Sequence, residues 1–166
     1  ALEVLKQHIP AGMISDPAEL LRFLFVAFPP DPGHHSIDGG EYLVRNLMGY
    51  DETTGAIGVT QHVCEGQTVS FTIRNPQMAR EDLKEMLARV STARDPEKPY
   101  RFGLYFNCCA RGRSLYGHDG IDTAYINSAL DEIPIAGFFG NSEFGPMSGG
   151  NRLFTYTGVL VLFSES

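Results

Sequence analysis

The chain has 166 residues, enough for one sizeable domain or two very small ones. Its formal net charge is −7, which argues against nucleic acid as the main partner, because binding to a phosphate backbone needs clustered Lys and Arg. The longest apolar runs, 23–28 and 159–163, are far shorter than the about 20 residues that cross a bilayer, so we expect no membrane insertion.

Cysteine usage favours a reducing environment. The three cysteines, Cys64, Cys108 and Cys109, are too few and odd in number for a disulfide framework, so we expect a cytoplasmic location. No break in composition marks a domain boundary, and we expect one domain over residues 1–166. Because the sequence starts at Ala1, we also expect that domain to have been cut from a longer protein.

The N-terminal half begins with a predicted helix over 1–8, followed by a second helix start at 16–21 with Asp16 as its N-cap. The apolar and aromatic run 21–28 favours a strand, and the proline-rich stretch 29–33 favours a loop.

Three alternating segments then predict strands over Tyr42–Met48, Ala56–Val63 and Thr68–Arg74. Turn residues separate them, so we expect an antiparallel meander. In the third segment Val69, Phe71 and Ile73 share one face.

The C-terminal half combines helices and strands. The strongest helix is predicted over 76–94, with an apolar stripe of Met78, Leu83, Met86, Leu87 and Val90. A buried strand at 100–107, a helix at 122–133 and strands at 135–139 and 153–164 follow. This order predicts an α+β fold, with helices packed on a mixed, largely antiparallel sheet.

A first candidate site lies where the predicted strand 100–107 ends. Two thiols and two guanidiniums follow at once, in Cys108, Cys109, Arg111, Gly112 and Arg113. A nearby arginine lowers the pKa of a thiol, and glycine lets backbone N–H groups approach an anion. The alternative is that each cysteine is a packed core thiol, and alternation along a strand puts the two on opposite faces.

A second candidate is a glycine-dense segment with a single acid. Its candidate residues are Gly137, Phe138, Gly140, Asn141, Glu143 and Gly145. Glycines permit close backbone approach to a ligand, and Glu143 could accept from an amine or pair with Arg111. The alternative is a structural hairpin loop. The segment lacks the Gly-Lys-Ser/Thr ending of a phosphate-binding loop.

Taken together, the motifs resemble the FIST C-terminal domain. That family pattern has a strand running into Cys-x-x-Arg-Gly, here at Cys108 to Gly112, and then Gly-Phe-x-Gly-x-x-Glu-x-Gly, here at 137–145. Segments 42–46, 64–69 and 151–163 are also similar to the family. The resemblance implies a sensory module of signal-transduction proteins that binds small ligands such as amino acids, next to an N-terminal FIST half or an output domain.

The resemblance also implies that a haem protein is an alternative. Two further hypotheses are a redox or haem sensor, with Cys108 or His118 as the reactive or ligating group, and a protein-interaction module. The histidines are scattered, His34 and His35 included, and predict no metal site. An enzyme using Cys108 as a nucleophile is the weakest reading, because no general base can be placed beside it. We therefore predict a ligand-binding domain without catalytic residues. The cofactor stays unknown.

Overall fold

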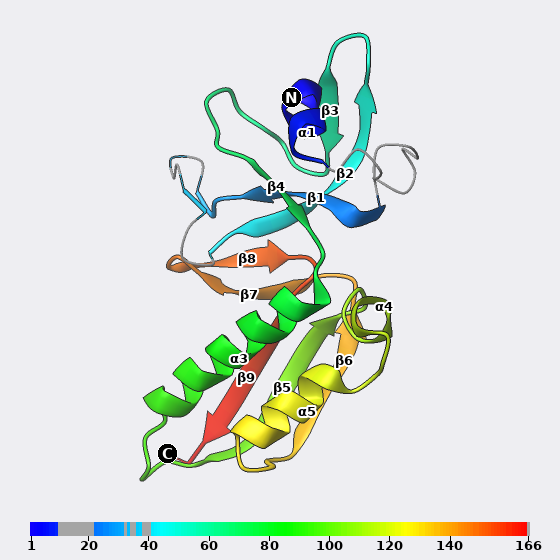
Figure 1. The fold of residues 1–166 in the computed structure, drawn as a ribbon. Helices are drawn as coiled ribbons and strands as arrows, with labels where there is room; N and C mark the ends of the chain where they lie inside the picture. The colour runs from blue at the N-terminus through cyan, green and yellow to red at the C-terminus, as the bar shows by residue number, and fades with distance from the viewer. Residues whose placement is uncertain (10–21, 32, 34–35, 38–40, 166) are drawn as a thin grey trace. The chain divides into compact units, whose positions relative to one another are not determined.

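The computed structural model describes residues 1–9, 22–31, 33, 36–37 and 41–165 (Figure 1). The chain forms two compact units, which are treated separately: Ala1–Arg74 with Pro146–Gly150, and Asn75–Gly145 with Asn151–Ser166. The predicted α+β class is confirmed, with helices and mostly antiparallel sheets. None of the helices in the described part of the chain combines the length and apolar composition that crossing a bilayer requires.

The first unit is built around a four-stranded antiparallel sheet. Its elements are α1 (Leu2–His8), β1 (Leu24–Phe28), β2 (Leu43–Asp51), β3 (Ala56–Val59) and β4 (Ser70–Ile73). The strand order is β3-β2-β1-β4, and all five residues of β1 are buried. A strand without polar positions is most stable in the middle of a sheet, where both faces are covered.

The predicted meander is wrong because β4 pairs with β1, with Phe25 opposite Thr72, and not with β3. The apolar β1 takes the central place that a meander would have given to β3. Val69 and Ile73 are 40% and 55% exposed, so the predicted apolar face is not a core face. β2 also continues through the predicted turn as far as Asp51, with an irregularity between Leu47 and Gly49.

Several predictions concern residues outside the described part of the chain. They are the helix start at 16–21, the first residue of the predicted strand at 21–28, and the expectation that His34 and His35 hold no metal ion.

The second unit holds the candidate residues. Its elements are α3 (Pro76–Ala93), β5 (Tyr100–Cys108), α4 (Arg113–Tyr116), α5 (Ile121–Ala129), β6 (Ile135–Gly140) and β9 (Gly158–Ser164). The hairpin of β7 (Glu143–Met147) and β8 (Gly150–Phe154) runs across the boundary between the units. β5 is the central strand of the sheet β6-β5-β9, parallel to β6 and antiparallel to β9.

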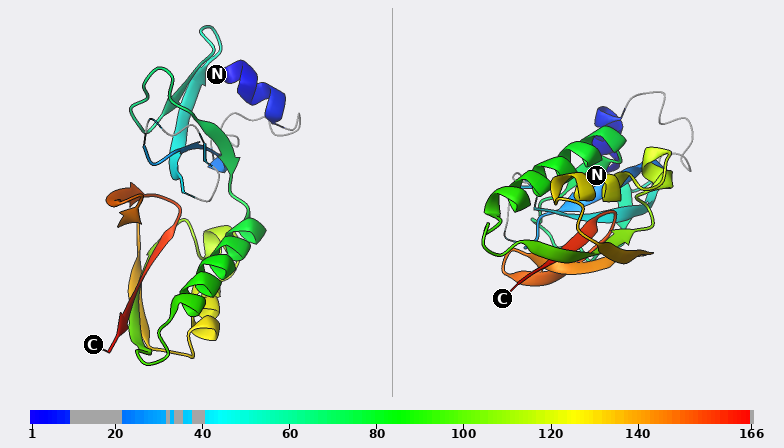
Figure 2. Two further views of the ribbon diagram at one scale, coloured as in Figure 1. Left: turned by 90° about the vertical axis from the view of Figure 1, so that its left-hand side faces the viewer. Right: turned by 90° about the horizontal axis from the view of Figure 1, so that it is seen from below.

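Both long helices of this unit cover one face of its sheet (Figures 1 and 2). Leu83 and Leu87 of α3 pack with Tyr105 of β5, and with Ile126 and Leu130 from α5 and its end. α3 begins where predicted, because the Asn75 side chain accepts from two backbone N–H groups of the first turn. The predicted stripe is confirmed except at Met78, which is 61% exposed.

The helices cover the Tyr105 side of β5, and the opposite face is less buried along most of the strand. On the opposite face Phe102 is 42% exposed and stacks on Phe163, with ring centroids 4.3 Å apart. Phe106 meets the ring of Phe138 edge-on at 5.3 Å.

Residues with positive φ shorten one predicted element and divide another. α5 stops at Ala129, and both Asp131 and Glu132 have positive φ, at 59° and 58°, which no continuing helix allows. The predicted strand 153–164 is two strands, because Tyr156 has a φ of 64° and interrupts the extended chain.

Candidate ligand site

The end of β5 is organised by a buried acid on the neighbouring helix, Asp122. One carboxylate oxygen, Oδ2, accepts from the Tyr105 hydroxyl at 2.9 Å, Asn107 Nδ2 at 3.0 Å and Arg111 Nε at 2.8 Å. The other, Oδ1, accepts from the Tyr116 hydroxyl at 2.8 Å and Arg111 Nη2 at 3.1 Å. The Asp122 side chain is 4% exposed, so five donors satisfy a carboxylate that water barely reaches.

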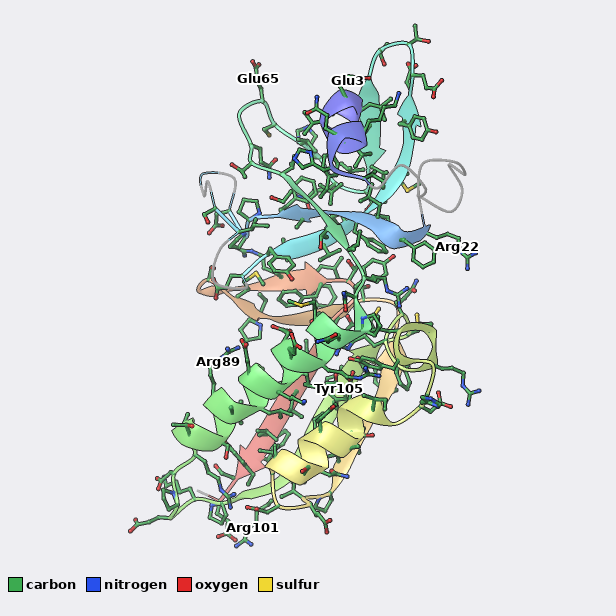
Figure 3. The ribbon with its side chains drawn as sticks, viewed as in Figure 1. Glu3, Arg22, Glu65, Arg89, Arg101 and Tyr105 are labelled. Atoms are coloured by element: carbon green, nitrogen blue, oxygen red, sulfur yellow. The ribbon has the colours of Figure 1, made fainter. Side chains whose placement is uncertain are left out.

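Strand and helix periodicity bring these groups together. Tyr105 and Asn107 alternate onto the helix-covered face of β5, and Tyr105 reaches from the strand toward α5 (Figure 3). Asp122 lies in the first turn of α5, one turn before the buried Ile126. Arg111 is held by a tight turn, in which its N–H donates to the Cys108 carbonyl at 2.8 Å.

The contacts within this cluster fix the protonation state of each member. Burial alone would raise the pKa of Asp122, but the hydrogen bonds and charge of Arg111 outweigh it and leave that pKa below its usual value. Burial would likewise lower the pKa of Arg111, and bonding to Asp122 raises it instead. The pKa values of Tyr105 and Tyr116 are raised, mainly by burial. The pair is therefore an ionised Arg–Asp couple with two neutral tyrosines.

Cys108 is a buried thiol, 3% exposed. Its sulfur accepts hydrogen bonds from the backbone N–H groups of Ala110 and Tyr156, but burial outweighs them and raises its pKa. The neighbouring Cys109 is exposed, and its thiol donates to Asn141 Oδ1 at 3.6 Å. β5 ends at Cys108, so strand alternation does not extend to Cys109, and the buried-thiol reading holds for Cys108.

Glu143 is the most unusual side chain of the site. It is 3% exposed, and neither carboxylate oxygen has a hydrogen-bond partner within the described structure. Burial raises its pKa to about 7, although the charge of Arg111 opposes the shift. Asn107 Oδ1, likewise buried, has no partner there either. Buried polar atoms are normally satisfied, so unsatisfied acceptors on a strand end indicate a place for a missing donor.

The glycines of the second motif have different roles, and the expected loop is mostly strand. Gly137 lies inside β6, where a Cβ would overlap the Tyr105 carbonyl, so glycine is required for the two strands to pair. Gly145 lies in β7, where a Cβ would come within 3.1 Å of Phe154 and Val159. Only Gly140 borders the acid: a Cβ there would lie 3.7 Å from Glu143 Oε1.

The structure thus gathers Cys108, Arg111, Gly140 and Glu143 around one strand end. Arg111 and Cys108 both interact electrostatically with Glu143, and Gly112 enters α4 with a φ of 58°. The predicted pairing of Arg111 with Glu143 is not observed, because the guanidinium bonds to Asp122 and Tyr116.

Three predicted residues lie apart, at the surface. Arg113 pairs with exposed Asp119 at 2.7 Å, Phe138 is 64% exposed, and Asn141 is exposed beside Cys109.

Sequence reasoning did not assign Asp122, Tyr105, Asn107 or Tyr116 to the site. A signal for Asp122 existed, because residues 122, 126 and 130 share one helical face, and an acid on an otherwise apolar stripe needs buried partners. The two tyrosines gave no such signal, since an aromatic residue on a buried face is ordinarily core.

The residues present do not fit a haem group at either predicted position. His118 is exposed in a loop next to the ion pair of Arg113 and Asp119. The Cys108 sulfur is enclosed and bonded by backbone N–H groups. Within the described residues, no group of three or more His, Cys, Asp or Glu side chains is placed to hold a metal ion.

One groove lies elsewhere, between α3 and α5, with a volume of about 310 Å³. It contains none of the predicted site residues. Its lining is Lys84, Leu87, Ala88, Ser91, Tyr125, Ser128 and Ala129.

Comparison with known proteins gives the class: a sensory module of signal-transduction proteins. The profile of the FIST C domain matches residues 1–146. The chain belongs to the FIST C domain family, as the motifs at Cys108–Gly112 and 137–145 predicted.

Similar proteins are found in mycobacteria. The chain is 39% identical over 161 residues to an uncharacterized protein of Mycobacterium tuberculosis (strain ATCC 25618 / H37Rv), covering 96% of this chain and 41% of that protein. It is 36% identical over 126 residues to an uncharacterized protein of Mycobacterium bovis (strain ATCC BAA-935 / AF2122/97), covering 76% of this chain and 32% of that protein. The chain therefore spans less than half the length of these relatives.

Proposed function

We propose that this chain is the ligand-binding part of a sensory protein and that it binds a small molecule, an amino acid or a similar carboxylate, at the end of β5. One observation carries the proposal: Glu143 is buried with both carboxylate oxygens unpartnered, beside Cys108 and Arg111. Burying an acid without a partner costs free energy, and such a cost is retained where a ligand recovers it.

The proposed site consists of two motif segments of the second unit. In this proposal Glu143 faces the ligand, Gly140 borders the Glu143 carboxylate, and Cys108 flanks it from β5. Of the remaining predicted residues, Gly112, Gly137 and Gly145 shape the backbone of these segments, and Arg113, Phe138 and Asn141 lie at the surface outside the proposed contact.

Arg111 contributes mainly as a positioning residue. Its Nε and Nη2 groups are engaged by Asp122 and Tyr116, so only Nη1 is left to meet an anionic group of the ligand. The Asp122 cluster holds the turn after β5 in place and thereby fixes the distance between Arg111 and Glu143.

We also propose a non-enzymatic, cytoplasmic role in which binding is passed to another part of a longer protein, an N-terminal FIST half or an output domain. The length of the mycobacterial relatives supports such a partner, and the three free cysteines suit a reducing compartment. A redox role for Cys108 has less support, because a raised pKa lowers the fraction of reactive thiolate.

Amide NMR spectra of the chain, recorded with single amino acids and with small carboxylates and amines, test the proposal. We expect at least one compound to shift the amide signals of 108–112 and 139–143 in a saturable manner. Shifts confined to the groove residues Lys84, Tyr125 and Ser128 would place the binding site in the groove between α3 and α5 and not at the end of β5. No saturable shift with any compound would refute ligand binding of this class.

A further inference from the structure

The buried polar atoms without partners define which chemical group the site lacks. In the described residues they are Asn107 Oδ1, Glu143 Oε1 and Glu143 Oε2, and all three are oxygens. An oxygen acceptor is satisfied by an N–H or O–H donor. The two unpartnered oxygens of Glu143 therefore call for a donor and not for a second anion.

The charge balance leads to the same chemical group. The guanidinium of Arg111 lies 2.8 Å from Asp122, so its positive charge is already compensated by a buried carboxylate. The thiol of Cys108 is bonded by backbone N–H groups, and burial keeps it neutral. Among the described residues, the cation that acts electrostatically on Glu143 is Arg111, and it is paired with Asp122. Once ionised, Glu143 leaves the cluster with one uncompensated negative charge.

Gly140 borders one oxygen of the acid. An alanine Cβ at this position would lie 3.7 Å from Glu143 Oε1 and 3.4 Å from the Ser142 carbonyl oxygen, both ordinary contact distances. The φ of Gly140 is not in the left-handed region, so alanine fits the backbone. A nitrogen that donates to Oε1 lies about 2.8 Å away and would compete with that methyl group for the same space.

We propose that the group recognised at this site is the ammonium of a small primary amine, which donates to the Glu143 carboxylate from the side of Gly140. This inference rests on the proposed function and gives it a ligand class. A carboxylate on the same ligand is tolerated but is not the group that the site selects.

Proton release should accompany binding. Only the ionised acid pairs with an ammonium, whereas the free site near pH 6 holds a protonated Glu143, because burial raises its pKa to about 7. Two titratable groups interact with Glu143 as it ionises. They are Arg111, which is paired with Asp122, and the neutral thiol of Cys108.

The test is titration calorimetry of the 166-residue chain with four probes: methylammonium, tetramethylammonium, acetate and glycine, all at one ionic strength. Methylammonium and glycine should bind and release protons at pH 6, as seen by comparing buffers of different ionisation heat. Tetramethylammonium has the charge but no N–H, and it should not bind. Acetate has no donor nitrogen and should not bind either.

Three variants locate the contact. Glu143→Gln keeps the shape of the side chain and loses the charge, and it should weaken methylammonium binding by about tenfold or more and abolish proton release. Gly140→Ala should weaken binding by a similar factor through the added methyl group. Glu97→Gln removes an exposed acid outside the site and should change nothing.

The results separate the inference from the proposed function. If acetate binds and shifts the amides of 139–143 while methylammonium does not, the amine assignment is wrong and the ligand site remains. Equal methylammonium binding in wild type and Glu143→Gln would also overturn it. If none of the probes binds, both the amine assignment and an amino-acid ligand fail.

Discussion

Asp122 is the residue on which the geometry of the site depends. Replacing it by Asn removes the charge that compensates Arg111 and leaves a buried guanidinium unpaired, which typically costs about 3–5 kcal/mol. We therefore expect Asp122→Asn to lower the free energy of unfolding in urea by about that amount at pH 7. The exposed Asp119→Asn change, which breaks the pair with Arg113, should have no measurable effect.

The acid range gives this prediction a second readout. A folded-state pKa below the unfolded value means that Asp122 stabilises the fold above the unfolded pKa, and that this stability is lost as the pH falls through the folded value. Wild type should lose stability as the pH falls below the ordinary Asp pKa, and Asp122→Asn should lose less over the same range. Parallel pH profiles of the two proteins would contradict this assignment.

Glu143 should give the opposite pH dependence. Its folded pKa of about 7 lies above the ordinary 4.5, so its contribution to stability is fully present below pH 4.5 and is lost as the pH rises through 7. Unfolding titrations of wild type should show stability falling by on the order of 3 kcal/mol across this window, the equivalent of the shift. Glu143→Gln should be flat there, and a slope that survives in the variant would assign the titration to another group.

The strand β6 depends on one glycine. Gly137→Ala places a methyl group against the Tyr105 backbone and should push β6 from β5, destabilising the chain by about 1–3 kcal/mol or more. Gly140→Ala on the same strand should cost much less, since its new methyl group meets only ordinary contacts. Thermal melts of the two variants decide this, and equal melting temperatures would show that the close approach at Gly137 is not limiting.

The elements also show what the sequence could predict. Local signals were sufficient for α3, where Asn75, Pro76 and an apolar stripe agree, and for β5 and β6. The partner of β4 was not predictable, because the choice between β3 and β1 depends on which strand is buried on both faces. The break at Tyr156 was also hidden, since nothing in an aromatic residue indicates a positive φ.

The same distinction applies to the candidate site. Cys108, Arg111 and Glu143 could be selected from their motifs, but the partner of Arg111 could not. Asp122 lies 11 positions further along the chain, on a helix, and competes with Glu143 for the guanidinium. Such a choice is made by packing of α5 on β5 and not by motif spacing.

At the scale of the whole molecule, the hydrophobic cores of the two units should unfold independently when one of them is destabilised. Leu5 is 1% exposed in the first unit and Ile126 is fully buried in the second. Each truncation to Ala should cost about 2–5 kcal/mol. We expect calorimetry to show two overlapping unfolding transitions. Leu5→Ala should lower the midpoint temperature of one, and Ile126→Ala that of the other. A single transition lowered equally by both variants would show that the units unfold together.

The Arg111–Asp122 pair has a consequence for how fast a ligand arrives. Because that cation is cancelled within the protein, no unpaired arginine of the cluster offsets the overall charge of −7 for an incoming molecule. Ammonium ions should therefore be drawn toward the protein and carboxylates held off during diffusional encounter. The association rate of an amine should fall as salt is added, while its dissociation from the buried acid should change little.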